Sequence, residues 1–260
     1  MSKELDVAKE TILKAGKLIM DFYTKQNFSV ENKEGFENFV TDADKDAEDL
    51  IKAELMKHFP DHGFRAEEIA NDPSDKEFVW IVDPLDGTRN FVKRKGEFAV
   101  HIGLAYKGES ILGVVYVPTR NRLYFAEKGK GAFCNNEPIK VSNNNMNNIR
   151  GVTTSSSTYY EELIVVNNKI PYKELAIRGS AGHKFCLVAE GVAEIFITPK
   201  NFLKEWDFCA PAIILKEAGG KITTFDGKEL IFNRKKLDYD QGVLGSNSII
   251  HEELLSLINS

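Results

Sequence analysis

The sequence predicts a mixed α/β fold, in which helices cover sheets. Apolar residues recur at helical spacing from Leu5 to Tyr23, and three β-type segments follow one another between residues 98 and 127. From about Gly151 onward, segments typical of strands alternate with segments typical of helices. Consecutive strands favour an antiparallel sheet in the first half, whereas alternation favours an α/β second half. A chain of 260 residues can bury a sizeable core in one unit or in two subdomains.

The first half is expected to begin with two amphipathic helices. The first, Leu5–Tyr23, presents one apolar face to the core, and the second is capped by Thr41 or Asp42 and runs to about His58. Between them, the polar stretch 25–38 is typical of a loop or a hairpin. The strands expected next are Phe78–Val82, Phe98–Tyr106, Ile111–Val117 and Arg122–Glu127.

An asparagine-rich stretch, Asn143–Asn148, is the predicted boundary between two halves, residues 1–148 and residues 149–260. A last helix is expected to follow Trp206 and to stop at Gly219-Gly220, with Asp207 as its N-cap. The other elements expected in the second half are a strand at 151–155, a strand ending at Arg178, a helix at 181–190 and a strand at 193–197.

The overall charge excludes one class of partner. The formal net charge is −5 and no basic tract stands out, so we expect no nucleic-acid polymer as ligand. An anionic substrate must then be met locally, by a metal or by a few lysines. The three cysteines, Cys134, Cys186 and Cys209, lie far apart in apolar contexts, which favours buried thiols in a reducing compartment. No signal peptide and no membrane span are recognisable, so we expect a cytoplasmic protein.

A conspicuous turn follows the strand at Phe78–Val82. It carries two carboxylates, Asp83 and Asp86, with Pro84 and Gly87 shaping the backbone around them. Asp-Pro and Asp-Gly are also ordinary turn signals. However, two carboxylates held close together repel each other and are most easily kept ionised by a cation between them. Hard oxygen ligands favour Mg²⁺.

This segment, taken together with two distant ones, resembles the inositol monophosphatase superfamily of Mg²⁺-dependent, lithium-sensitive phosphatases. The similar motifs are an acidic pair at Glu67-Glu68, the run Asp83-Pro84-Leu85-Asp86-Gly87-Thr88, and Trp206-Asp207 followed by a helix that ends in Gly-Gly. The resemblance implies a layered αβαβα sandwich with a mixed first sheet, a homodimer, a small phosphate ester as substrate, and two or three Mg²⁺ ions.

The resemblance also implies roles for individual residues. Asp83 bridges metals, Glu67 and the Leu85 carbonyl complete one metal site, and Asp86 with Asp207 complete another. Thr88 and Glu67 orient a metal-activated water that attacks phosphorus, and no covalent phosphoenzyme is required. The amides of Gly87 and Thr88 hold phosphate oxygens. Asp44 matches the second acid of a V-T-x-x-D motif near the metals, although an acid favoured at a helix start is an equal explanation.

Lys33 and the basic cluster at residues 93–95 each allow more than one interpretation. Lys33 resembles a loop lysine near the water network of the metals, but it also fits a solvated surface lysine. The cluster Lys93–Lys95 fits either an anion-binding patch or, more commonly, a solvated surface.

The substrate is harder to predict than the reaction. Asn90-Phe91 is the form seen in inositol monophosphatases, whereas the segments 95–98, 179–191 and 206–211 look more like 3'(2'),5'-bisphosphate nucleotidases. Lys200 stands where inositol monophosphatases typically have a glutamate, and an ammonium suits a second phosphate. The predicted substrate contacts are therefore Gly87, Thr88, Ser180, Ala181, His183, Lys184, Lys200 and Asp207.

These observations make 3'-phosphoadenosine 5'-phosphate the expected substrate. The alternative is an inositol-1-monophosphatase or a fructose-1,6-bisphosphatase. A non-catalytic metal-binding or partner-binding protein on the same fold is a remote further alternative, because every expected ligand position is intact.

Overall fold

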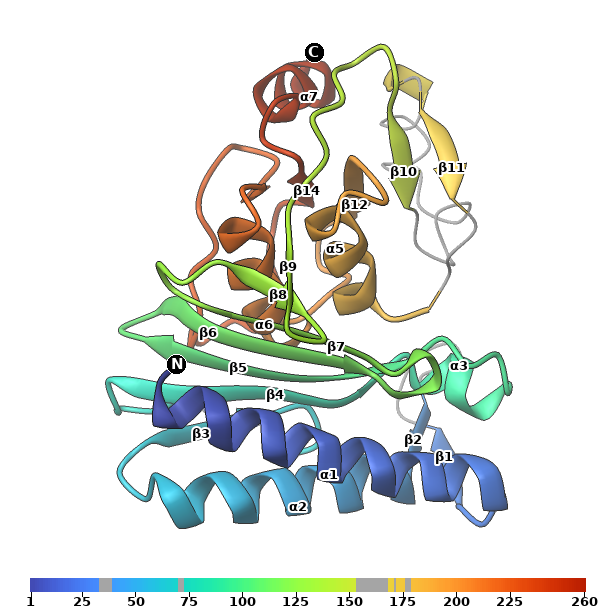
Figure 1. The fold of residues 1–260 in the computed structure, drawn as a ribbon, viewed down its shortest axis with the longest axis vertical. Coiled ribbons are helices and arrows are strands. Elements are labelled where there is room, and N and C mark those ends of the chain that lie inside the picture. The colour runs from blue at the N-terminus through green and yellow to red at the C-terminus, as the bar shows by residue number, and fades with distance from the viewer. Residues whose placement is uncertain (33–38, 70–72, 153–167, 171, 176–178) are drawn as a thin grey trace.

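The computed structural model describes residues 1–32, 39–69, 73–152, 168–170, 172–175 and 179–260. Within these residues the chain forms five layers in the order helix, sheet, helix, sheet, helix (Figure 1). This is the αβαβα sandwich that the resemblance implies.

The first layer consists of α1 (Lys3–Lys25) and α2 (Asp42–His58), which pack side by side under the first sheet (Figure 1). The apolar face predicted for α1 is buried in the core, through Leu5, Ala8, Ile12, Ala15 and Ile19. The N-cap of α2 is Thr41, one of the two predicted residues. Before it, β1 (Val30–Asn32) and β2 (Phe39–Thr41) pair antiparallel, as a hairpin would. Lys33 lies outside the described residues.

The first sheet contains seven strands in the order β3-β4-β5-β6-β7-β8-β9. Its strands β3 and β4 pair parallel, and the remaining neighbours pair antiparallel, so the sheet is mixed as expected. The bounds are β3 Gly63–Ala66, β4 Phe78–Asp86, β5 Ala99–Tyr106, β6 Glu109–Val117, β7 Arg122–Glu127, β8 Ala132–Cys134 and β9 Glu137–Ile139. Short helical segments, α3 (Thr88–Val92) and η1 (Pro118–Arg120), follow β4 and β6.

The middle layer is formed by α5 (Ala181–Ala189) and α6 (Glu205–Glu217), which fill the space between the two sheets. Almost every side chain of these helices is buried, because they contact apolar surface on both sides. The backbone of α6 approaches β6 so closely that a Cβ at Gly113 would lie 2.2 Å from the carbonyl oxygen of Ala210. The helix is therefore seated directly on the first sheet.

The second sheet contains five strands in the order β11-β10-β12-β14-β13, and α7 (His251–Asn259) covers its outer face. The bounds are β10 Arg150–Val152, β11 Lys173–Leu175, β12 Ile195–Thr198, β13 Lys221–Thr224 and β14 Val243–Ser246. Neither β13 nor β14 nor α7 was among the elements that the sequence analysis singled out. The predicted strand positions 153–155 and 176–178 lie outside the described residues.

The predicted boundary at Asn143–Asn148 falls in the connection from β9 to β10. The core between the sheets combines side chains from both predicted halves, such as Ile81 and Phe208. The division into residues 1–148 and 149–260 stays a prediction. All three cysteines are free and buried, as expected. Within the part of the chain that the structure describes, no helix is long and apolar enough to cross a bilayer.

Candidate metal and phosphate site

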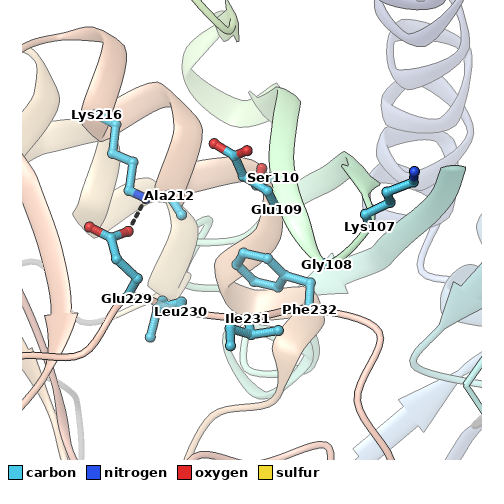
Figure 2. Close-up of a pocket in the computed structure, with 10 residues that line it drawn as sticks. All are labelled: Lys107, Gly108, Glu109, Ser110, Ala212, Lys216, Glu229, Leu230, Ile231 and Phe232. Atoms are coloured by element: carbon cyan, nitrogen blue, oxygen red, sulfur yellow. Dashed lines mark hydrogen bonds and ion pairs between the residues drawn. The ribbon is translucent and has the colours of Figure 1, made fainter. Parts of the chain in front are cut away.

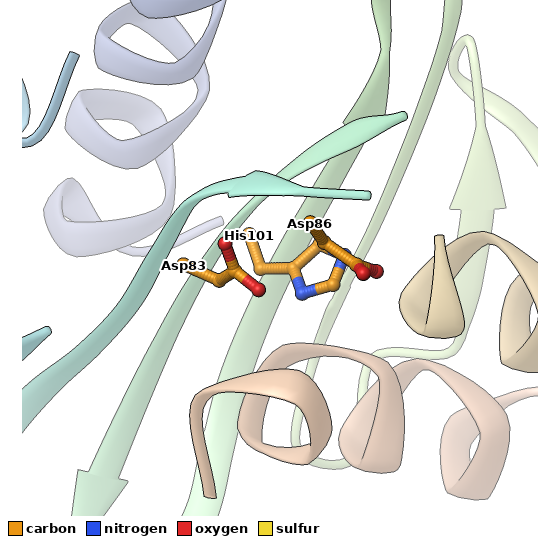
Figure 3. A group of neighbouring side chains, drawn as sticks. All are labelled: Asp83, Asp86 and His101. Atoms are coloured by element: carbon orange, nitrogen blue, oxygen red, sulfur yellow. The ribbon is translucent and has the colours of Figure 1, made fainter. Parts of the chain in front are cut away.

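Asp83 and Asp86 lie at the end of β4, which continues four residues beyond the predicted strand end at Val82. In a regular strand, side chains three residues apart point to opposite faces. Here the pairing with β5 shifts: Asp83 pairs with His101 and Asp86 pairs with Ala99, so three steps on β4 match two on β5. This β-bulge turns both carboxylates to one face of the sheet. Figure 3 shows them beside His101.

These three side chains form a compact group. Their ligand atoms all lie within 4.8 Å of one another, and all three residues are buried. The Asp86 carboxylate accepts hydrogen bonds from Ser180 Oγ at 2.5 Å and from the Gly182 amide at 2.9 Å, and His101 Nε2 lies 3.1 Å from it. Asp83 is held differently, because its Oδ1 accepts the Leu85 amide at 3.0 Å.

The pKa values of Asp83 and Asp86 are shifted in opposite directions. Burial raises the pKa of Asp83 well above its usual range, and the charges of nearby acids add to the rise, in the order Glu67, Asp86 and Asp207. Burial opposes ionisation of Asp86 too. Its pKa is nevertheless lowered, because His101 and the hydrogen bonds from Ser180 and Gly182 stabilise the charged form.

Asp207 comes to the same place from the second half of the chain. It is not the N-cap of α6, as predicted, but the third helical residue, and its Oδ2 accepts the amide of the true N-cap, Lys204, at 2.7 Å. The side chain of Asp207 therefore reaches back across the first turn. Burial raises the pKa of Asp207 well above its usual range, and Asp86 and Glu67 raise it further. The predicted acids are thus close enough to act on one another.

Glu67 lies in a turn directly after β3, because the strand ends at Ala66. The parallel register pairs Ala66 with Val82, the residues directly before Glu67 and Asp83. The neighbouring acid, Glu68, is held by its backbone, since its amide donates to Glu48 Oε2 at 2.8 Å. Besides burial, the charge of Glu67 raises the pKa of Asp83.

Thr88 is the first residue of α3, and its hydroxyl is fixed by two acceptors. Thr88 Oγ1 lies 2.9 Å from Asp44 Oδ1 and 3.0 Å from the Leu85 carbonyl oxygen. Asp44 Oδ2 in turn accepts the amide and the hydroxyl of Thr41, at 2.8 and 2.6 Å. Burial raises the pKa of Asp44 to about 6. Asp44 is therefore an acid in the first turn of α2, as one explanation predicted, and it also contacts Thr88. Its predicted place near the metals stays a prediction.

Gly87 is required by the backbone at this point. Its φ is 97°, and a Cβ would lie 2.8 Å from the carbonyl oxygen of Glu97. Gly87 is the N-cap of α3, so its amide lies at the N-terminus of that helix. The proposed binding of phosphate by the amides of Gly87 and Thr88 stays a prediction.

The predicted substrate contacts divide into two groups. Ser180 is the N-cap of α5 and contacts Asp86, and Ala181, His183 and Lys184 are buried beside it in the first turn of the helix. Burial lowers the pKa of His183 to about 3, and Lys184 Nζ lies 5.3 Å from the centre of the Phe196 ring.

Lys200 lies on a different segment and is exposed in the turn after β12. The structure joins Ser180 directly to the Asp86 carboxylate, and the role of Lys200 stays a prediction. Lys93 and Lys95, at the end of α3 and beyond it, are also surface residues.

Three features of this region were not predicted. His101 sits beside Asp86, Glu48 is buried and binds the backbone after Glu67, and Arg65 forms a buried ion pair with Glu205. A signal existed for His101 and Arg65, because each interrupts a mainly apolar strand. Glu48 lies four residues after Asp44 on the same face of α2. Acids are common on helices, so this spacing alone does not mark Glu48 as part of the site.

A separate pocket of about 450 Å³ lies at the other end of β5 and β6, at their connecting turn (Figure 2). An ion pair between Lys216 and Glu229 crosses one side of it, and Ser110 donates from its hydroxyl to the Cys209 carbonyl at 2.6 Å. None of the predicted site residues lines it; the lining is Lys107, Gly108, Glu109, Ser110, Ala212, Lys216, Glu229, Leu230, Ile231 and Phe232.

Comparison with known proteins shows which sequences and structures this chain resembles. The chain matches the inositol monophosphatase family over residues 1–260. A fructose-1,6-bisphosphatase/inositol-1-monophosphatase of Thermotoga maritima is 35% identical over 256 residues, which are 98% of this chain and 95% of that protein. A histidinol-phosphatase of Chlorobaculum parvum is 34% identical over 257 residues, 96% of each chain. The solved structure of a Thermotoga maritima IMPase aligns with a TM-score of 0.86 at 33% identity, over 99% of this chain and 97% of that one.

The fold, the buried carboxylates and these relatives define a phosphatase, a hydrolase of phosphoric monoesters. More particularly, the chain belongs to the inositol monophosphatase family. Members of this family depend on metal ions and act on small phosphate esters.

Proposed function

We propose that the chain is a Mg²⁺-dependent phosphatase that hydrolyses inositol 1-phosphate and fructose 1,6-bisphosphate. The observation that carries the metal dependence is the convergence of Asp83, Asp86 and Asp207 from β4 and α6 on one buried site. The substrate class rests on the similar Thermotoga maritima protein, which is named for both activities. This reverses the order expected from the sequence, since no relative reported above is named as a bisphosphate nucleotidase.

The donor set fits Mg²⁺. It consists of carboxylate and carbonyl oxygens, which are hard ligands, and the acids raise one another's pKa as they would around a place for a cation. The residues that would hold two or three ions are Glu67, Asp83, Leu85, Asp86 and Asp207. His101, with its ring beside Asp86, orients that carboxylate rather than replacing it.

Bound Mg²⁺ would neutralise the phosphate and lower the pKa of a coordinated water. The chain's own residues then orient that water. Thr88 Oγ1 has one proton, which it directs to Asp44 or to the Leu85 carbonyl, so its lone pairs stay available to accept a hydrogen bond from the water. The pKa of about 6 suits Asp44 to take up a proton near neutral pH. In the attack, the water oxygen would form a bond to phosphorus as the ester P–O bond breaks. The proton of the water would pass toward Asp44, and the leaving alkoxide would take up a proton from solvent.

The test is phosphate release at matched enzyme concentration from inositol 1-phosphate, fructose 1,6-bisphosphate, histidinol phosphate and 3'-phosphoadenosine 5'-phosphate. We expect activity that needs Mg²⁺, stops with excess chelator and is inhibited by Li⁺ and Ca²⁺, with the highest kcat/KM on one of the first two substrates. Undiminished activity in chelator would refute the metal mechanism. A clear preference for the nucleotide would refute the substrate assignment and leave the mechanism standing.

The homodimer and the cytoplasmic location belong to the same proposal. Light scattering coupled to size exclusion tests the first, with a mass near twice that of the 29.3 kDa chain as the expected result.

A further inference from the structure

An ion pair is buried beside the carboxylate site. Arg65 Nη1 on β3 lies 2.5 Å from Glu205 Oε1 in the first turn of α6, and the two side chains are 2% and 0% exposed. Arg234, in the loop after β13, contacts both members of the pair. Arg65 Nη1 also donates to the Arg234 carbonyl at 2.5 Å, and the Arg234 amide donates to Glu205 Oε2 at 3.3 Å.

The position of this pair in the sequence is informative. Arg65 precedes Glu67 by two residues, and Glu205 precedes Asp207 by two residues. Arg65 pairs in register with Ile81, whose side chain faces the core beside α6, so Arg65 points to the same side of the sheet. The pair therefore joins the two backbone segments that carry Glu67 and Asp207.

We infer that the Arg65–Glu205 pair is a positioning device that fixes the separation of the metal ligands Glu67 and Asp207. This rests on the proposed function, which supplies the metal. Glu67 follows β3 of the first sheet and Asp207 lies on α6, 140 residues further along the chain, and the acids of the site repel one another. Without a restraint, that repulsion would push the turn after β3 and the first turn of α6 apart until a cation binds.

The chemistry of the pair suits a restraint better than an apolar contact would. A buried ion pair contributes little net stability compared with well-packed apolar residues of similar volume. Its direction and length are nevertheless defined, because a guanidinium donates in a fixed planar geometry. Residues that hold a metal ligand in place typically change metal affinity by about 10- to 100-fold when they are lost.

The double variant Arg65→Met/Glu205→Leu separates positioning from stability. It removes both charges together, so the net charge near the site is unchanged. Metal affinity is measured without substrate, by calorimetric titration with Mg²⁺ and by the rise of the melting temperature with Mg²⁺. We expect a melting temperature close to wild type in metal-free buffer and a Mg²⁺ dissociation constant about tenfold higher. A pair that only stabilised the fold would leave the Mg²⁺ affinity unchanged.

The control is Arg122→Met/Glu190→Leu, which removes a more exposed pair that links β7 to the C-terminal end of α5. It should leave Mg²⁺ affinity unchanged. Wild-type affinity in the Arg65/Glu205 variant overturns the inference alone, whereas a wild-type protein that binds no Mg²⁺ overturns it together with the proposed function. If the double variant does not fold, Arg65→Lys is measured instead; a several-fold weaker Mg²⁺ affinity supports the inference, and wild-type affinity overturns it.

Discussion

Thr88 Oγ1 and Asp44 Oδ1 lie 2.9 Å apart and join the first turn of α3 to the first turn of α2. The contact couples a hydroxyl at the predicted water position to a buried carboxylate. Because both acceptors of the Thr88 hydroxyl are defined, removal of that hydroxyl gives a direct test.

Thr88→Ala should lower kcat by about 10²- to 10⁴-fold with little change in KM, since the water loses its orientation but the substrate keeps its metal contacts. Steady-state kinetics at saturating Mg²⁺ measure this. Thr88→Ser is the matched control, because it keeps the hydroxyl, and should retain most of the activity. Equal loss in both variants would show that the hydroxyl is not the important group.

Substitution of Asp83 and of Asp86 should have opposite effects on stability. In metal-free buffer, Asp83→Asn removes a buried acid whose ionisation is opposed by burial and by the other acids, so the free energy of unfolding should rise relative to wild type. Asp86→Asn loses charge-assisted bonds to Ser180 and Gly182 and should be destabilised by about 1–3 kcal/mol.

Urea unfolding in chelator tests this pair of variants, and both should lack activity with Mg²⁺. Destabilisation by Asp83→Asn would contradict the electrostatic argument.

Gly182→Ala should damage the site by a steric route. A Cβ at this position would lie 2.2 Å from His101 Nε2, so the ring or the start of α5 must shift, which disturbs the contact between His101 and Asp86. We expect a destabilisation of about 1–3 kcal/mol and a reduced kcat. Thermal unfolding and kinetics measure the two effects.

Stability should also depend on pH through His251. Burial lowers the pKa of this histidine to about 4, with Lys221 adding to the effect, and the ring contacts Thr223 Oγ1 and Ser246 Oγ at 2.9 and 2.7 Å. Since its unfolded pKa is about 6.5, the unfolded chain binds more protons between pH 6.5 and pH 4. Its contribution is complete above pH 6.5 and falls by about 1–3 kcal/mol toward pH 4.

Urea unfolding at pH 7 and at pH 4.5 measures that loss. His251→Gln has no titrating group, so it should lose less stability than wild type over this range. An identical loss in both proteins would assign the pH dependence to other groups.

The sequence predicted what local patterns encode. The helix faces of α1 and α2, the strands β5 to β7 and the acidic motifs were all recognisable, because periodicity and turn residues act over a few positions. The bulge between Asp83 and Asp86 was not, since it depends on the register with β5. The pairing of Arg65 with Glu205 joins residues far apart in sequence, and His101 gains its partner only when two strands meet. The strands β13 and β14 are four residues each, too short for a periodic signal.

Because α6 contacts the first sheet closely at Gly113, a change at this contact would move the whole helix. Ala210, the point of contact, lies one turn from Asp207, so any side chain added at Gly113 would lift or tilt the helix and carry the carboxylate with it. Harmful variants of this protein should therefore include positions on β6 that touch neither metal nor substrate. Screening for lost activity by distance from the carboxylates alone would overlook them.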